Sequence, residues 1–373
     1  MSPTSSPDCP FHFGGAIVDP RYFVGRRAEL DFISDRVVGD QPTSINIVGG
    51  QRIGKTCLLY HFYQTYEQRI QNRGKDPRNY VAVYLSLEGV HCQSEEKFYN
   101  AIAKAFLARP AVQHRSELVA AFQGKMLDRA GFSEALREWK SSGVLPILCL
   151  DKFESLMRRR KKFDNDFYNN LRSLMDGNAL MLVIASYKSL TFYSLLHRLT
   201  SSFFNLGQNQ PLELFADEEA LDLVRLPDPK NPVLSDNNRQ LALEWGEKHP
   251  ALLQLAAISL FDAQQHNRSK EWARQQFRLQ AGKVPKWYRL QKVGRGFLTI
   301  GKVMVSLPVS VVSWIERIGN WVGRAIAFSI GTAFIIAIVM AISGQLDLTE
   351  VPNLFRKIWC STFADVMPDW CSD

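Results

Sequence analysis

The chain has 373 residues, enough for about two domains, and its 46% hydrophobic and 22% charged residues predict that most of it folds. Its formal net charge is +8, but residues 283–324 contribute +7 of this and residues 345–373 contribute −3. Because most of the excess positive charge lies in one segment and the rest of the chain carries only +4, the basic composition argues little for nucleic acid, and we do not expect nucleic acid as a partner.

The N-terminal part begins with a Ser- and Pro-rich stretch, residues 1–10, which has no apolar segment, so we expect no signal peptide there. Residues 22–30 then lead into a predicted helix, because Leu30, Ile33 and Val37 recur at helical spacing.

A phosphate-binding pattern, G-x-x-x-x-G-K-[ST], follows. It is formed by Gly49, Gly50, Gln51, Arg52, Ile53, Gly54, Lys55 and Thr56. Residues 44–48 before it predict a buried strand, and the residues from Cys57 onward predict a helix. In this arrangement backbone N–H groups and a helix N-terminus surround phosphate oxygens. We expect residues 49–57 to bind ATP or ADP, with Lys55 at the outer phosphates and Thr56 on Mg²⁺.

The segment Phe-Val-Gly-Arg-x-x-Glu-Leu within residues 22–30, followed by the P-loop, resembles the entry to STAND-type ATPases (signal-transduction ATPases with numerous domains) and their AAA+ relatives. The resemblance covers roughly residues 10–265. It implies an α/β P-loop NTPase fold of the ASCE or AAA+-like type, in which a parallel sheet has helices on both faces and a helical lid follows. It also implies that Gly25 and Arg26 cover the adenine side of the nucleotide.

Three further apolar runs predict strands at residues 80–87, 145–151 and 179–186, and a closing strand is predicted at residues 211–215. Asp151 ends the second of these runs, where ligands bind in open α/β sheets, and it is our candidate Walker B acid for Mg²⁺. Many relatives place Glu directly after this Asp, whereas this chain has Lys152 there and Glu154 two residues later. Either Glu154 is the general base, which we favour, or hydrolysis is slow and the protein acts mainly as a nucleotide-state switch.

Two further site residues follow from the resemblance. Ser186, at the end of the 179–186 run, matches the position of sensor 1, with Lys188 as the next candidate. Arg198 lies where many relatives carry an arginine finger that acts across a subunit interface. The cationic run at residues 158–162 is a solvated helix face or a contact with a neighbouring subunit, anionic lipid or nucleic acid.

Beyond residue 215 the pattern is helical, at residues 218–224, 238–245 and 250–262. The region around Pro250 resembles the lid of STAND proteins, in which a proline packs near the base, so Pro250 is a candidate nucleotide contact.

The C-terminal part predicts a membrane anchor. Residues 325–343 carry no charge and as a helix would span about 28 Å, close to the hydrocarbon thickness of a bilayer. The basic flank precedes the span, so the positive-inside rule predicts a single-pass protein of the cell inner membrane with a cytoplasmic ATPase domain. Cys360 and Cys371 would then lie outside, where they can form a disulfide.

The segment before the span, residues 297–320, carries polar residues at helical spacing on an apolar helix. Three interpretations remain: it lies in the membrane interface, it packs against the lid, or it lines a polar path through the bilayer in an oligomer. We expect these parts along the chain: an N-terminal extension at 1–20, the P-loop NTPase domain at 21–215, the lid at 216–282, a basic linker and amphipathic helix at 283–322, a transmembrane helix at 323–344 and an acidic tail at 345–373.

Together these features predict a membrane-anchored, ATP-binding, STAND-like switch that forms a homo-oligomer on nucleotide exchange or hydrolysis. The resemblance implies a role in signalling or antiphage defence, with the membrane segment acting on lipid as effector and a separate sensor or partner protein. Two alternatives remain: a membrane-tethered AAA+ motor of the secretion-accessory type, and an origin-recognition-like ATPase that binds nucleic acid.

Overall fold

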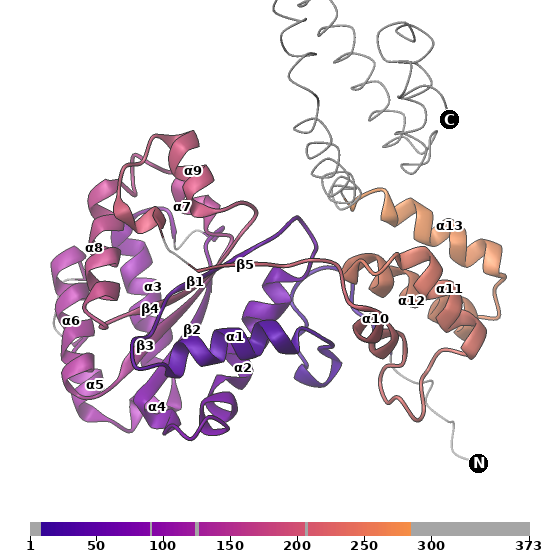
Figure 1. The fold of residues 1–373 in the computed structure, drawn as a ribbon, viewed down its shortest axis with the longest axis horizontal. Coiled ribbons are helices and arrows are strands. Elements are labelled where there is room, and N and C mark those ends of the chain that lie inside the picture. The colour runs from indigo at the N-terminus through magenta and orange to yellow at the C-terminus, as the bar shows by residue number, and fades with distance from the viewer. Residues whose placement is uncertain (1–8, 90–91, 124–126, 206–207, 285–373) are drawn as a thin grey trace, which may run out of the picture. The chain divides into compact units, whose positions relative to one another are not determined.

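The computed structural model describes residues 9–89, 92–123, 127–205 and 208–284 of the chain (Figure 1). They belong to one compact unit, Met1–Val284, which contains a sheet domain and a helical lid.

The sheet has five parallel strands in the order β2-β3-β4-β1-β5. The strands are β1 Ile45–Val48, β2 Tyr80–Ser86, β3 Leu145–Asp151, β4 Met181–Ser186 and β5 Asn209–Pro211. The predicted parallel α/β sheet is therefore confirmed. Strand β4 separates β1, which leads into the P-loop, from β3, which ends in Asp151.

Both faces of the sheet are covered. Leu148 and Leu150 of β3 belong to a large core cluster that includes aromatic residues of α3 and α8. The alternate residues Ile147 and Cys149 point to the opposite face and are also fully buried. A strand buried on both faces reads as a continuous apolar run, which is why β3 was visible in the sequence.

The helices of the sheet domain connect and cover these strands, with α2 packed on β2, β3 and β4 and α1 packed on α2 (Figure 1). Aspartates accept hydrogen bonds from the backbone at the starts of α6 and α8 and so fix where these helices begin. The helices are α1 Arg27–Val38, α2 Lys55–Gln71, α3 Glu95–Leu107, α4 Pro110–Gln113, α5 Ser116–Ala120, α6 Arg129–Ser141, α7 Glu154–Met157, α8 Asn165–Asp176 and α9 Leu190–His197, with short 3-10 turns η1 Pro20–Tyr22, η2 Pro77–Asn79 and η4 Ser202–Asn205.

The lid consists of α10 Asp217–Val224, α11 Asp236–Gly246, α12 Pro250–Gln265 and α13 Lys270–Ala281. Helix α12 packs against the other three, and its apolar residues form a separate core cluster with theirs. Phe11, from the N-terminal segment, is 5% exposed and belongs to this lid cluster. The sequence predicted the first three of these helices but did not single out α13.

The closing strand was predicted in the wrong place. It was expected at residues 211–215, but β5 is Asn209–Pro211, a short edge strand beside β1. The apolar residues that suggested the strand are buried for other reasons: Leu212 donates its N–H to the carbonyl of Val48, and Phe215 packs in the lid cluster. Burial of the connection to the lid therefore imitated a strand signal.

Among the described residues, no helix is long and apolar enough to cross a bilayer. The predicted transmembrane helix at 323–344, the acidic tail with Cys360 and Cys371 and nearly all of the basic linker at 283–322 lie outside the described residues.

Candidate nucleotide-binding and hydrolysis site

The P-loop connects β1 to α2 in a conformation that exposes its backbone N–H groups. Arg52 and Gly54 have positive φ angles of 63° and 101°, so the chain turns tightly just before α2 begins at Lys55. A larger residue than glycine would clash at position 49, because a Cβ there would lie 2.8 Å from Cγ2 of Ile53. This geometry places a helix N-terminus and successive N–H groups around one small volume, which suits phosphate oxygens.

The Lys55 ammonium group lies over the loop. Its Nζ donates to the carbonyls of Gly49 and Gly50, at 2.7 and 2.8 Å, and lies 4.4 Å from the centre of the Tyr187 ring. Burial lowers the pKa of Lys55 to about 8, although the carboxylates of Glu154 and Asp151 oppose this shift. A partly desolvated cation of this kind binds an anionic ligand strongly.

Asp151 is held by three hydrogen bonds at the end of β3. Thr56 Oγ1 and the Tyr84 hydroxyl donate to Oδ2, at 2.8 and 3.0 Å, and the Lys152 N–H donates to Oδ1 at 3.0 Å. A threonine hydroxyl beside a carboxylate is the hard oxygen donor set that Mg²⁺ takes when phosphates and waters supply its other ligands. No group of three or more His, Cys, Asp or Glu gathers as a metal cage within the part of the chain that the structure describes. Thr56 and Asp151 therefore fit a nucleotide-bound magnesium ion.

Tyr84 was not predicted as a site residue. Its hydroxyl shares Oδ2 of Asp151 with Thr56, and burial beside Asp151 raises the pKa of Tyr84 well above its usual range. In the sequence Tyr84 looks like any aromatic residue of a buried strand, because nothing marks which face of β2 reaches the site.

The side chains of Lys152 and Glu154 lie in different surroundings. Lys152 has a positive φ of 58°, and its ammonium group forms an ion pair with Glu88. Glu154, at the start of α7, is only 3% exposed, and its Oε2 has no hydrogen-bond partner among the described residues. Burial raises the pKa of Glu154, and Lys55 partly opposes this. Glu154 is thus buried at the pocket together with Asp151, whereas Glu88 is exposed.

Most of these residues line one pocket of about 320 Å³, whereas Gly49, Gly50 and Tyr84 are not among its lining residues. The pocket lining from the P-loop and its surroundings includes Gln51, Arg52, Ile53, Gly54, Lys55, Thr56, Cys57, Asp151, Lys152, Glu154 and Tyr187. From the lid come Pro250, the first residue of α12, and Gln254. The structure therefore brings Pro250 to the pocket that the P-loop residues form.

The N-terminal segment lines another part of the pocket, although the sequence placed residues 1–20 in an N-terminal extension. Its lining residues are His12, Phe13, Gly14, Gly15 and Ile17. His12 N donates to Oε1 of Gln254 at 2.8 Å, and the guanidinium of Arg52 lies 4.6 Å from the centre of the Phe13 ring. The thiol of Cys57 lies 3.7 Å from the Gly15 carbonyl. In the sequence this segment is marked by two successive glycines, Gly14 and Gly15. Both have positive φ angles in the structure, a backbone conformation that glycine adopts readily.

Gly25 and Arg26 are placed differently from one another. Arg26 lines the pocket, but its guanidinium donates to the carbonyls of Ile53 and Glu213, at 3.3 and 2.6 Å, and pairs with Glu29 at 2.9 Å. Gly25 has a φ of 73°, and a Cβ there would lie 2.7 Å from Oε1 of Glu219 on α10. Both residues thus lie at the junction between the P-loop and the lid, and the predicted position of Gly25 and Arg26 at the adenine side of the nucleotide stays a prediction.

Ser186 and Arg198 do not line the pocket. The Ser186 hydroxyl is fully buried and lies 2.9 Å from Oδ1 of Asn46 and 2.7 Å from the Lys188 carbonyl. The next residue, Tyr187, is the one that lines the pocket at this strand end. Arg198 follows α9, is exposed and has a φ of 53°. Its predicted role across a subunit interface is not tested by one chain.

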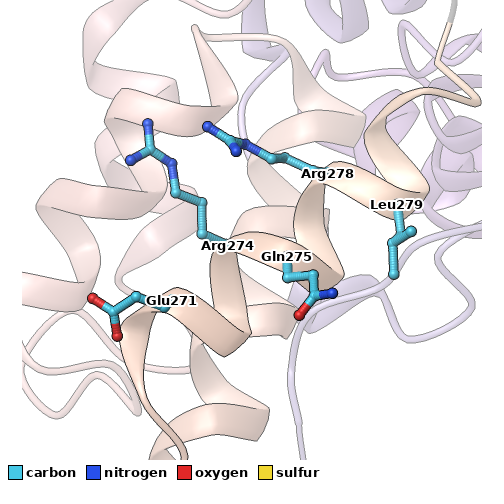
Figure 2. Close-up of a pocket in the computed structure, with 5 residues that line it drawn as sticks. All are labelled: Glu271, Arg274, Gln275, Arg278 and Leu279. Atoms are coloured by element: carbon cyan, nitrogen blue, oxygen red, sulfur yellow. The ribbon is translucent and has the colours of Figure 1, made fainter.

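A separate hollow of about 390 Å³ lies on α13 and shares no lining residue with the nucleotide pocket. Figure 2 shows Arg274 and Arg278, one helical turn apart, projecting in the same direction. Its lining residues are Glu271, Arg274, Gln275, Arg278 and Leu279.

Comparison with known proteins adds information about the fold. No protein-family model matches the sequence, and no curated protein matches it. Among solved structures, the chain is similar to the Walker-type ATPase PABY2304 of Pyrococcus abyssi, with 14% identity and a TM-score of 0.52 over 77% of this chain and 79% of that one. It is also similar to the ORC2 protein of Aeropyrum pernix in its ADPNP-ADP complexes, with 13% identity and a TM-score of 0.53 over 91% and 81% of the two chains. The described part of the chain therefore shares the α/β fold of these two proteins.

Proposed function

We propose that the chain is an ATPase that binds ATP with Mg²⁺ at the P-loop. The observation that carries this proposal is the 2.8 Å hydrogen bond between Thr56 and Asp151, which line the same pocket as Lys55 and Glu154. Thr56 lies in α2, directly after β1 and the P-loop, and Asp151 ends β3. They are 95 positions apart in the chain and meet because β1 and β3 belong to one sheet.

The site residues have complementary roles in this proposal. Lys55 exchanges the carbonyls of Gly49 and Gly50 for phosphate oxygens, and its positive charge stabilises the charge that develops on the transferred phosphoryl group. Thr56 and Asp151 would hold Mg²⁺, which neutralises phosphate charge when bound. Glu154 accepts a proton from the attacking water. Burial raises the pKa of Glu154, and a raised pKa suits a general base that works near neutral pH.

The more specific proposal is a membrane-anchored, STAND-like switch of the cell inner membrane, with a cytoplasmic ATPase domain. It acts as a homo-oligomer with a separate sensor protein, in signalling or antiphage defence, and its C-terminal segment acts on membrane lipid. Its support comes from the sequence alone: the uncharged run at 325–343, the basic flank before it and Lys152 in place of the usual Glu.

The second candidate is an origin-recognition-like ATPase that binds nucleic acid. The specific observation in its favour is the fold likeness to the ORC2 protein, which extends over 91% of this chain. This likeness favours the second candidate over a STAND assignment, and it weighs against our expectation that nucleic acid is not a partner. A tethered AAA+ motor would share the same ATPase site.

One set of measurements tests these proposals on the full chain. We expect ATP turnover by the native chain, loss of turnover in Lys55→Ala and no change in Lys104→Ala, which removes an exposed lysine of α3 as a matched control. Turnover that survives Lys55→Ala would contradict the ATPase proposal.

The two functional candidates separate in parallel assays. Depolarisation of cells that depends on Lys55 supports the membrane switch. Salt-sensitive binding of duplex DNA, with membranes intact, supports the origin-recognition-like candidate.

A further inference from the structure

Helix α9 carries an apolar face on its solvent side. Phe192, Leu195 and Leu196 are 47%, 77% and 61% exposed, and their i, i+3, i+4 spacing places them on one face. The opposite side of the helix packs inward through Leu190 and Ser194, which are buried. These three side chains are half of the six large hydrophobic residues that are exposed in the described part of the chain. Helix α9 is therefore apolar toward the core and also toward solvent.

The cationic run at residues 158–162 lies beside this helix. Arg160 donates from its guanidinium to the carbonyl of His197 at 3.5 Å, and α7, which precedes the run, contacts α9 (Figure 1). The run is fixed in place by Arg159, which donates to the carbonyls of Leu87 and Cys92 at 3.4 and 2.8 Å. Arg160 therefore meets the C-terminal end of α9, and the exposed Lys161 and Lys162 follow it directly in the chain.

The cations around α9 are uncompensated. Arg160, Lys161, Lys162 and Arg198 are all exposed, and none forms a salt bridge within residues 9–284 as the structure describes them. The nearby acid Asp164 is paired with Arg129 instead. We call Arg160, Lys161 and Lys162, with Phe192, Leu195 and Leu196, the α9 surface. Arg198 is left out of it, because this residue is the predicted arginine finger for a subunit interface.

We propose that the α9 surface is a contact site for an anionic lipid membrane. Apolar side chains bordered by arginine and lysine are what an interfacial segment presents to a bilayer: the leucines enter the boundary between headgroups and acyl chains, and the cations contact lipid phosphates. Nucleic acid would use the cations but leave three exposed apolar side chains in water. A second copy of the chain would have to supply both an apolar face and acidic partners. The proposal rests on the membrane location of the more specific function above.

The test uses the full chain with lipid nanodiscs and follows backbone hydrogen exchange. Discs of phosphatidylcholine alone are compared with discs that also contain phosphatidylglycerol. A C-terminal anchor would insert in both kinds, so the neutral discs control for anchoring. We expect slower exchange in peptides covering residues 158–162 and 189–199 with anionic discs only.

Two variants sharpen the result. The double variant Lys161→Gln/Lys162→Gln removes two cations that each contribute about a fivefold gain in affinity, so the ratio of protected to unprotected protein in anionic discs should fall on the order of thirtyfold. The matched control, Lys75→Gln/Lys104→Gln, removes two exposed lysines elsewhere and should behave like the native chain. Leu195→Ser should also weaken the protection.

Each other outcome overturns the proposal. Equal protection in both kinds of disc removes the role of anionic lipid, and protection by duplex DNA without lipid assigns the surface to nucleic acid. Protection that grows with protein concentration in the absence of discs assigns it to a second copy, and no protection at all leaves the surface without a partner. ATP turnover measured in the same samples keeps a failure of this proposal distinct from a failure of the ATPase proposal.

Discussion

Glu154→Gln tests the proposed base most directly. The substitution keeps the size of the side chain but removes its ability to accept a proton. The native carboxyl is 3% exposed, lines the pocket and has one oxygen without a hydrogen-bond partner among the described residues, so an attacking water there has an acceptor. A positioned general base contributes about 10²–10⁴-fold, and we expect turnover to fall by that factor. ATP binding should be at least as tight, because a negative charge near the phosphates is lost.

The assay is single-turnover hydrolysis of ATP, with nucleotide affinity measured separately by titration. The matched control is Glu88→Gln. Glu88 lies on the same side of the sheet but pairs with Lys152, is 53% exposed and does not line the pocket, so its loss should change turnover by less than about tenfold. If Glu154→Gln hydrolyses ATP at a rate near that of the native chain while Glu88→Gln does not, the base has been assigned to the wrong carboxylate.

Tyr84→Phe removes a hydrogen bond to Asp151, the carboxylate that we propose holds magnesium. The Mg²⁺ concentration for half-maximal turnover should therefore rise about tenfold, whereas Tyr80→Phe on the same strand should leave it unchanged. Equal effects of the two substitutions would contradict a positioning role for Tyr84. Arg26→Met breaks the buried ion pair with Glu29 and should lower the free energy of unfolding by about 3–5 kcal/mol in urea titrations. The control Arg27→Met, at an exposed neighbour, should cost less than about 1 kcal/mol. Similar losses in the two variants would show that the junction to the lid contributes little to stability. Burial lowers the pKa of His61 from 6.5 to about 4. The stability that its neutral ring contributes is therefore complete above pH 6.5 and is lost as the pH falls toward 4. Between pH 7.5 and pH 5 the free energy of unfolding of His61→Phe should fall by about 2 kcal/mol less than that of the native chain, and parallel losses would contradict this.

The strands were the most predictable part of the chain. Residues 145–151 and 179–186 were predicted, and β3 Leu145–Asp151 and β4 Met181–Ser186 follow closely, because strands buried on both faces leave uninterrupted apolar runs. The position of the short edge strand β5 was predicted wrongly. The next residue, Leu212, is buried beside Gly49 of the P-loop, and this burial extended the apolar pattern beyond the strand.

Residues of the site that belong to a local motif were predictable, since a fixed spacing brings Lys55 and Thr56 together whatever the rest of the fold does. Residues that act through tertiary contact were not. Tyr84 reaches Asp151 from a neighbouring strand, and the orientation of its ring depends on strand register. The same limit applies at β4, where a shift of one residue decides whether Ser186 or Tyr187 faces the pocket.

The contact between His12 and Gln254 joins positions 242 residues apart in the chain. During synthesis at about 5–20 residues per second, roughly 10–50 s separate the appearance of these two residues. The P-loop, β3 and Glu154 are all synthesised within that interval, before Gln254 can accept the hydrogen bond from His12. We therefore expect a stage of synthesis in which the nascent chain carries the phosphate-binding residues without the enclosure that the lid provides. Chains released after residue 215 and after residue 284 should then differ in how strongly they retain nucleotide.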